Sequence, residues 1–539
     1  MSETADLHTI AQASDIRSRT RQIFGRRVSA KARDFLGVNG EGDRTVFRVW
    51  APDRASAILT VEDHAWRDGG WLRYRSEHFT RDVIYTEPIN VYELHLGTWA
   101  CREDGSSMTY SELARELTSY VKQMGYTHVA ILRDREDDTP LTWGEWACES
   151  FTPSDRHGSP KDFMGFVDSL HEAGIGVLID WLPAEFGSFD IDLGREEVQA
   201  FLLSGVLYLI EAYHVDGLRV EALDAILYLD YGKGDGEWTP NAKGGNERLE
   251  AIDFFKKLNA FLSREYPDVI TVATDRSIRG DVTGELGFTL RANTGWQDTA
   301  LFYTEQDPLW RKFHHRRLVT EQARAFGERY VLPISADTVS GGRRSLLDKC
   351  PGEYQQKFAG ARVFLAYMMT HPGKKLLFMG SEIGQFCEFH RRRTTEWFLT
   401  EFETHARLQQ YTAELGQFYL SEPPLWQRDG DREGFVWIDA DDADHSTYSY
   451  RRIDADGREL LILLNFTPVV REDYLLAVPS EGVYEEVFNS DAPRYGGTGV
   501  KNTGLFRAEP HIRRAYRHAI RITVPPLAAV IFRKTEDDS

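Results

Sequence analysis

The chain has 539 residues, of which 42% are hydrophobic and 27% charged, a composition typical of a globular protein of roughly two to four domains. Lys and Arg total 64 and Asp and Glu total 84, so the formal net charge is −20. This charge argues against a nucleic-acid-binding surface and favours a neutral substrate over an anionic one.

The sequence predicts a cytoplasmic protein. Its first residues show neither the basic stretch nor the apolar core of a signal peptide, and no run of about 18 apolar residues follows that would span a membrane. The four cysteines are widely spaced and form no CxxC pair, so we expect free thiols and no metal site; they are Cys101, Cys148, Cys350 and Cys387.

The first 90 residues divide into two parts. Residues 1–44 are polar and predict an N-terminal extension. Residues 45–90 begin with apolar and polar positions in alternation, broken by Ala51-Pro52-Asp53, which is typical of short strands. This second part therefore predicts a small β domain.

From residue 91 to about residue 425, strand-like and helix-like segments alternate. The expected strands are near-continuous apolar runs at 90–95, 127–132, 176–180, 218–220 and 268–273, and the expected helices lie at 110–125, 161–173, 196–212 and 247–265. Such alternation predicts an α/β fold, either a (β/α)8 TIM barrel or a doubly wound sheet. No GxGxxG motif follows a strand, which weakens the dinucleotide-binding version of the sheet. The long connection between 132 and 161 favours the barrel.

After residue 425 the helical periodicity ends. Short alternating segments separated by turn residues follow at 434–438, 446–451, 460–466, 484–489 and 520–524. They predict a C-terminal β-sandwich over residues 426–539.

The most informative stretch is YHVDGLRVEALDAILYLDY at 213–231. An apolar run that contains Arg219 ends at the carboxylate Glu221, and an apolar segment follows. Barrel enzymes present catalytic acids in this way, at the carboxyl end of a strand. A buried Arg–Glu pair without catalytic function is the alternative.

Several motifs resemble bacterial 1,4-α-glucan (glycogen) branching enzymes of glycoside hydrolase family 13. They include VYELHLGTW (91–99), GIGVLIDWLPAEF (174–186), YHVDGLRVEALDAILYLDY (213–231), YVLPISADTV (330–339) and YGGTGV (495–500), and the resemblance runs from about residue 45 to residue 532. It implies a carbohydrate-binding β domain at 45–90, a (β/α)8 barrel at 91–425 and a β-sandwich at 426–539. The first of these domains is about half the family's usual length and is therefore expected to be small or truncated.

The resemblance implies a retaining transglycosylation, in which one carboxyl group attacks the anomeric carbon and a second serves as acid and base. The family's nucleophile pattern resembles DGLRVDA, and Glu221 stands at its final Asp. The general-acid pattern resembles TIAEES, and Thr274 stands at its first Glu, with Asp275 next. Asp337 stands at the transition-state-stabilising Asp of a pattern resembling SHDEV.

The same resemblance assigns the residues around the substrate. Asp180 and Arg219 match the family. Three positions differ from it: Glu185 replaces a His, Ala336 replaces the His before Asp337, and Glu145 replaces a Tyr after Trp143. The substrate-binding set is thus Trp143, Glu145, Asp180, Glu185, Asp275 and Ala336, and no cofactor or metal is expected.

Three interpretations follow. The first is a branching-enzyme-like protein that binds α-1,4-glucan or glycogen, with weak or no branching activity because the acid position holds Thr274. The second is an active α-glucan transglycosylase or hydrolase that uses Glu221 as nucleophile and Asp275 or Glu185 as acid and base. The third is a non-catalytic regulatory or scaffold protein with a protein partner in glycogen metabolism.

Overall fold

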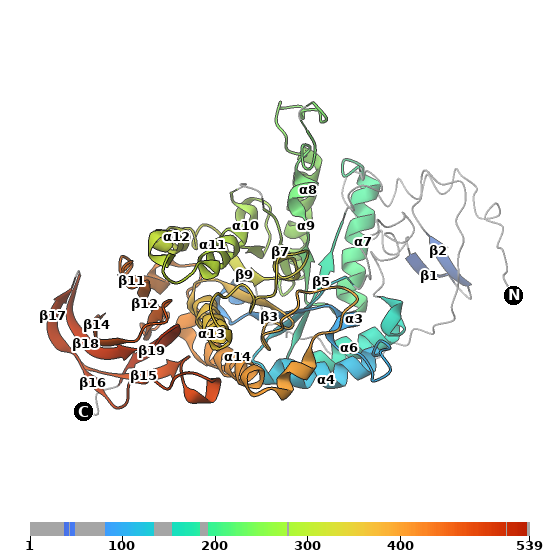
Figure 1. Ribbon diagram of the computed structural model, residues 1–539. Coiled ribbons are helices and arrows are strands. Elements are labelled where there is room, and N and C mark those ends of the chain that lie inside the picture. The colour runs from blue at the N-terminus through green and yellow to red at the C-terminus, as the bar shows by residue number, and fades with distance from the viewer. Residues whose placement is uncertain are drawn as a thin grey trace.

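The computed structural model describes residues 37–41, 44–48, 81–133, 154–183, 192–234, 236–276, 280–513 and 515–535. Its centre is a closed barrel of eight parallel strands in the order β10-β3-β4-β5-β6-β7-β8-β9 (Figure 1). These strands are β3 (Asn90–Leu94), β4 (His128–Ile131), β5 (Gly176–Trp181), β6 (Gly217–Val220), β7 (Ile270–Ala273), β8 (Leu290–Ala292), β9 (Tyr330–Ile334) and β10 (Lys374–Phe378). The (β/α)8 prediction is confirmed, and the doubly wound sheet is excluded.

Helices surround the barrel. They are α3 (Leu96–Trp99), α4 (Tyr110–Gln123), α6 (Pro160–Glu172), α7 (Glu196–Ala212), α8 (Leu223–Leu227), α9 (Leu249–Glu265), α10 (Val282–Glu285), α11 (Thr294–Glu305), α12 (Arg311–Gln322), α13 (Tyr354–Thr370) and α14 (Glu403–Ser421). Thr109 and Glu112 form a capping box that fixes the start of α4, and Ser159 and Asp162 do the same for α6. Both helices begin where polar residues precede the apolar periodicity.

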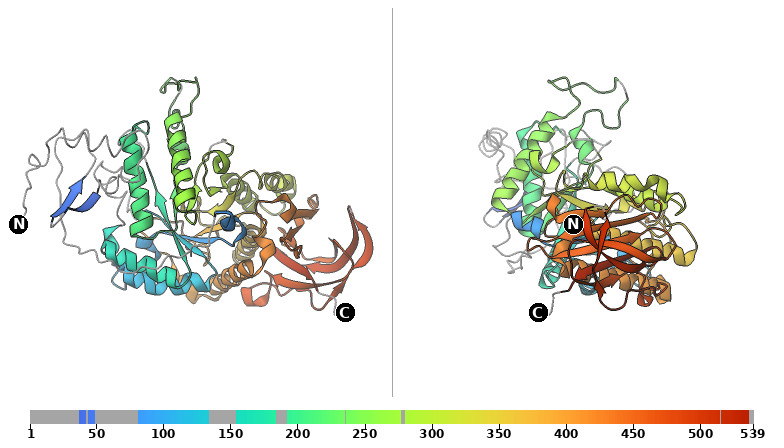
Figure 2. Two further views of the ribbon diagram at one scale, coloured as in Figure 1. Left: turned by 180° about the vertical axis from the view of Figure 1, so that it is seen from behind. Right: turned by 90° about the vertical axis from the view of Figure 1, so that its left-hand side faces the viewer.

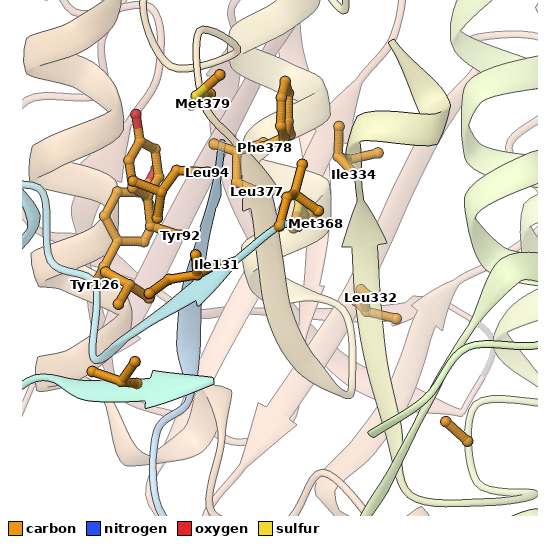
Figure 3. Packing of buried hydrophobic residues seen from close by; sticks show 14 of the residues in the cluster. Tyr92, Leu94, Tyr126, Ile131, Leu332, Ile334, Met368, Leu377, Phe378 and Met379 are labelled. Atoms are coloured by element: carbon orange, nitrogen blue, oxygen red, sulfur yellow. The ribbon is translucent and has the colours of Figure 1, made fainter. Parts of the chain in front are cut away.

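The strand side chains divide between two cores, because successive residues of a strand point to opposite faces. Tyr92 and Leu94 of β3 pack outward against helices, together with Leu377 of β10 (Figure 3). A separate cluster contains Val91 of β3, Leu178 of β5 and Val272 of β7, with Ala130, Ile270, Leu290, Ala292, Val331 and Leu376. The alternation assigns this second cluster to the barrel lumen.

The C-terminal domain contains two antiparallel sheets, with strand orders β11-β12-β13-β19-β15-β16 and β14-β18-β17. The strands are β11 (Phe435–Asp439), β12 (Thr447–Ile453), β13 (Glu459–Asn465), β14 (Arg471–Val478), β15 (Val483–Asn489), β16 (Phe506–Arg507), β17 (Glu509–Arg513), β18 (Tyr516–Val524) and β19 (Ala528–Lys534). Leu463 of one sheet and Ile520 of the other lie in one buried cluster between them. The predicted β-sandwich is confirmed, and it lies beside the barrel, against the outer helices α13 and α14 (Figure 2).

Buried cations join the barrel to the sandwich through backbone carbonyl groups. Arg311 of α12 donates to the oxygen of Phe466 at 2.5 Å, and Arg362 of α13 donates to that of Ser490 at 2.9 Å. In the opposite direction, Arg452 of β12 donates to the oxygen of Thr370 at 2.7 Å. Because each guanidinium is buried, its hydrogen bonds hold the two domains in a fixed arrangement.

Before the barrel, β1 (Gly37–Glu41) and β2 (Arg44–Arg48) form an antiparallel pair, and α2 (Arg81–Thr86) precedes β3. The remainder of the proposed small β domain, residues 49–80, lies outside the described residues. Across the part of the chain that the structure describes, no helix has the length and apolar character needed to cross a membrane.

Candidate active site

The site is built around the Arg219 guanidinium, which contacts three carboxylates. Its Nε and Nη2 atoms bind the two oxygens of Asp180 at 2.7 and 3.0 Å, and its Nη1 atom binds Oε1 of Glu93. Nε also lies 2.8 Å from Oε1 of Glu221. One buried cation therefore ties together side chains from three parts of the barrel.

Strand alternation explains why these side chains meet. Asp180 is two residues after the lumen residue Leu178, and Thr274 is two residues after Val272, so both face the lumen at the carboxyl ends of their strands. Arg219 is paired with Asp180 in the register of β5 and β6. The carboxyl ends of barrel strands are where the active sites of this architecture lie.

Glu93 is the one member of the cluster that the sequence-based assignment missed. Its side chain is only 1% exposed, and its Oε2 atom accepts a 2.8 Å hydrogen bond from the backbone nitrogen of Ala336. Glu93 thus links Arg219 to the 3₁₀ turn η4 (Ala336–Thr338) that carries Asp337. The available signal was a single acidic residue within the short strand NVYEL, all of whose residues are buried.

Thr274 points at Glu221. The Thr274 hydroxyl donates to Oε1 of Glu221 at 3.3 Å, and its backbone nitrogen donates to the oxygen of Val220 at 2.9 Å. The chain turns after Glu221 at Ala222, whose φ is 49°, and the backbone nitrogen of the next residue, Leu223, donates to the oxygen of Thr274 at 3.0 Å. The structure therefore brings the nucleophile position and the general-acid position together.

The carboxyl groups of the site lie so close together that ionisation of all of them at once is disfavoured. Burial raises the pKa of Glu221 to about 8, although Arg219 opposes the shift, and Asp180, Asp337 and Glu93 raise it further. Burial likewise raises the pKa of Glu93 to about 7, again against the effect of Arg219. Near pH 7 the cluster therefore holds at least part of a proton, because one guanidinium faces several carboxyl groups.

Asp337 and Ala336 lie at the edge of this cluster. Asp337 is exposed, and its charge contributes to the raised pKa of Glu221. Ala336 is half-buried and supplies only its backbone nitrogen, to Glu93. The turn is closed by Thr338, whose hydroxyl accepts from the backbone nitrogen of Ser335 at 3.0 Å.

Asp275 belongs to a different network. It has the opposite parity to Val272 and Thr274, so it faces away from the lumen, and its carboxylate accepts from Nε of Arg291 at 2.8 Å. Arg291 also binds Glu328.

The structure brings together Glu93, Asp180, Arg219, Glu221 and Thr274, with Asp337 and Ala336 beside them, and it directs Asp275 elsewhere. Trp143, Glu145 and Glu185 lie outside the described residues.

The raised pKa of Glu221 predicts a pH effect on stability. The folded state holds the proton up to about pH 8, whereas an unfolded Glu releases it near its ordinary pKa of 4.5, so stability falls as pH rises between these values. Glu221→Gln is expected to remove this decrease in stability, because a glutamine side chain has no proton to release in this pH range. We expect urea denaturation to give unfolding free energies within about 1 kcal/mol of one another at pH 5, and at pH 8 a gain of roughly 3–4 kcal/mol for the variant, because each pH unit between the two pKa values is worth about 1.4 kcal/mol. A variant that loses stability at pH 8 relative to pH 5 as steeply as the parent would contradict the assignment.

Comparison with known proteins gives a consistent result. Residues 437–535 match the model described as Alpha amylase, C-terminal all-beta domain. The chain is 40% identical over 518 residues to the 1,4-alpha-glucan branching enzyme GlgB of Halothermothrix orenii, with 89% of this chain and 81% of the relative covered. It is 41% identical over 516 residues to the GlgB of Albidiferax ferrireducens, with 89% and 82% covered.

Solved structures share the fold at much lower identity. The alpha-amylase of Geobacillus thermoleovorans, complexed with acarbose, has a TM-score of 0.60 at 11% identity, with 86% of this chain and 100% of that chain covered. The alpha-amylase of H. orenii has a TM-score of 0.57 at 13% identity, with 83% and 99% covered. These likenesses support the arrangement of a barrel followed by a C-terminal β domain.

Proposed function

Since the chain belongs to the 1,4-α-glucan branching enzyme family of glycoside hydrolase family 13, we propose that it binds α-1,4-glucan or glycogen at the Arg219 site and has little or no branching activity. The observation that carries this proposal is the position of Thr274. Its hydroxyl faces Glu221 where the family places a carboxylic acid.

Retaining transglycosylation needs an ionised nucleophile and a separate proton donor. A threonine hydroxyl does not release a proton near pH 7, and the loss of a general acid typically costs about 10²–10⁴-fold in rate. Two described acids close to the site can be excluded, because Asp275 faces Arg291 instead of the lumen and Glu93 is buried beneath Arg219. Neither supplies an evident substitute for the missing acid.

The state of Glu221 also disfavours attack on a sugar. Its pKa of about 8 keeps most molecules protonated at pH 7, and its Oε1 atom is already engaged by Arg219 and Thr274. A glutamate is also one methylene longer than the family's aspartate. A misplacement of about 1 Å costs roughly a hundredfold in rate. Substrate binding does not require either carboxyl group to react.

One observation favours an active transglycosylase as the second candidate. Asp180 Oδ1 and Glu221 Oε1 lie 2.7 and 2.8 Å from Nε of Arg219, so these oxygens lie no farther apart than the retaining separation of about 5–5.5 Å. In this version Glu221 would be the nucleophile. A non-catalytic scaffold that has lost glucan binding as well is the third candidate.

Incubation of the pure protein with amylose tests these candidates. We expect iodine absorbance and the number of α-1,6 linkages to stay constant while the protein binds glycogen. Turnover that Glu221→Gln abolishes would support the active enzyme, and turnover that survives this substitution would exclude Glu221 as nucleophile. Absence of both turnover and glycogen binding would favour the scaffold.

A further inference from the structure

Helix α12 has an unusual distribution of side chains. Its buried residues are Arg311, His315, Leu318, Glu321 and Gln322, most of them polar, whereas large apolar groups at its N-terminal end are exposed. Trp310 is 60% exposed, Phe313 is 66% exposed and Leu309, in the preceding turn, is 77% exposed. Amphipathic helices normally direct such residues inward, so exposed aromatic groups at the start of a helix that buries mostly polar side chains suggest a binding surface.

The two aromatic rings form one shallow surface. The Trp310 and Phe313 ring centroids lie 5.7 Å apart, and their planes are inclined by 35°. The ammonium group of Lys312 lies 5.1 Å from the Phe313 ring centroid, and Arg316 is exposed one turn farther along the helix. Leu309, Trp310 and Phe313, here named the α12 platform, thus form an apolar surface next to two hydrogen-bond donors.

The polar face of α12 holds this platform in place. Arg311 donates to the backbone oxygens of Phe466 at 2.5 Å and Thr304 at 2.7 Å, and the His315 ring stacks on Tyr448 at 4.0 Å. The helix is therefore anchored in the junction between barrel and sandwich (Figure 1). The helix that carries the platform is held in place before any ligand arrives, which lowers the entropic cost of binding.

The size of the platform favours a carbohydrate over a protein. A stable protein interface needs roughly 20–30 residues on each side, whereas this surface offers three apolar side chains among charged neighbours. A glucose ring presents a C–H face that packs on an aromatic ring, and its hydroxyls accept hydrogen bonds from groups such as Lys312 and Arg316. Two rings inclined to one another suit successive units of a curved α-1,4 chain.

We propose that the α12 platform is a second α-1,4-glucan-binding site, separate from the Arg219 site. The assignment of an α-1,4-glucan as the ligand rests on the proposed function. The location rests on α12 alone. A polymer such as glycogen can occupy both sites at once, so the platform would raise the effective glucan concentration at the barrel.

Affinity electrophoresis in glycogen-containing gels, with the full chain, measures the contribution of the platform. Trp310→Ala combined with Phe313→Ala is expected to weaken glycogen binding about tenfold or more, because two stacking faces are lost. Trp310→Tyr should retain most of the affinity. The matched control is Leu505→Ala combined with Ile512→Ala, which removes exposed apolar groups from the C-terminal domain and should leave binding unchanged.

Hydrogen exchange with maltoheptaose separates this proposal from the proposed function. Slower exchange at 306–318 supports the platform, whereas slower exchange at 217–224 and 336–344 reports the Arg219 site. Protection at 306–318 alone would support glucan binding at the platform and overturn glucan binding at the Arg219 site. Protection at 217–224 and 336–344 alone would overturn glucan binding at the platform. Unchanged glycogen affinity of the double variant would also overturn it, as would a change in oligomeric state without a change in affinity.

Discussion

Thr274→Glu combined with Glu221→Asp is expected to raise the branching rate by at least about a hundredfold over the unsubstituted chain. The first substitution places a carboxylic acid where a hydroxyl now faces the nucleophile position at 3.3 Å. The second shortens the nucleophile by one methylene. The added carboxyl group joins a cluster that already raises the pKa of its acids, so it would retain the proton that it must donate.

Initial rates of α-1,6 linkage formation on amylose, counted after enzymatic debranching, test this expectation. Thr274→Gln combined with Glu221→Asp is the matched control, since the amide has the same shape and no transferable proton. It should remain at the parent rate. An equal gain in both double variants would show that the acid is not needed, and a parent chain already as fast as the reconstructed one would place the proton donor elsewhere.

Arg219→Met is expected to reduce the unfolding free energy by about 3–5 kcal/mol at pH 8, because it leaves a buried carboxylate cluster without its cation. Glu93 and Asp180 both contact this guanidinium from positions that are nearly inaccessible to solvent. Removal of the positive charge raises the pKa values of Glu93 and Glu221 further. The carboxyls then bind protons more readily, so the deficit should shrink as the pH falls from 8 towards 5.

Chemical denaturation of the parent and the variant at several pH values measures this effect. Arg311→Met provides the control, because Arg311 is buried but donates to the backbone oxygens of Phe466 and Thr304. The decrease in unfolding free energy caused by Arg311→Met should therefore depend little on pH. If the deficit of Arg219→Met were constant between pH 5 and pH 8, the carboxyl cluster would not be the source of the instability.

The sequence predicted the barrel because its strands are long apolar runs and its helices have clear periodicity. The expected helices at 110–125 and 196–212 correspond to α4 and α7. Strands β8, β9 and β10 were not among the expected strands, and β8 gave the weakest signal, since Leu290–Ala292 contains only three residues and includes an arginine. Its place in the barrel is set by pairing with β7 and β9, which is tertiary information.

Only those residues of the candidate site that lie in recognisable sequence motifs could be predicted from the sequence. The motif resemblance identified Arg219, Glu221 and Thr274, and the structure brings them together. It did not identify Glu93, because this carboxylate belongs to the site through its contact with Arg219, which lies 126 positions away in the sequence. The orientation of Asp275 depends on Arg291, on the next strand, so single-sequence reasoning left its role open.

The buried arginines at the domain junction have a consequence for unfolding. Arg311 and Arg362 of the barrel, together with Arg452 of the sandwich, donate to carbonyls across the boundary, so separating the domains would expose or orphan all of these groups. Barrel and sandwich should therefore melt as one cooperative unit, with a single calorimetric transition. A ligand on α12, which lies in this junction, would raise the melting temperature of both domains together.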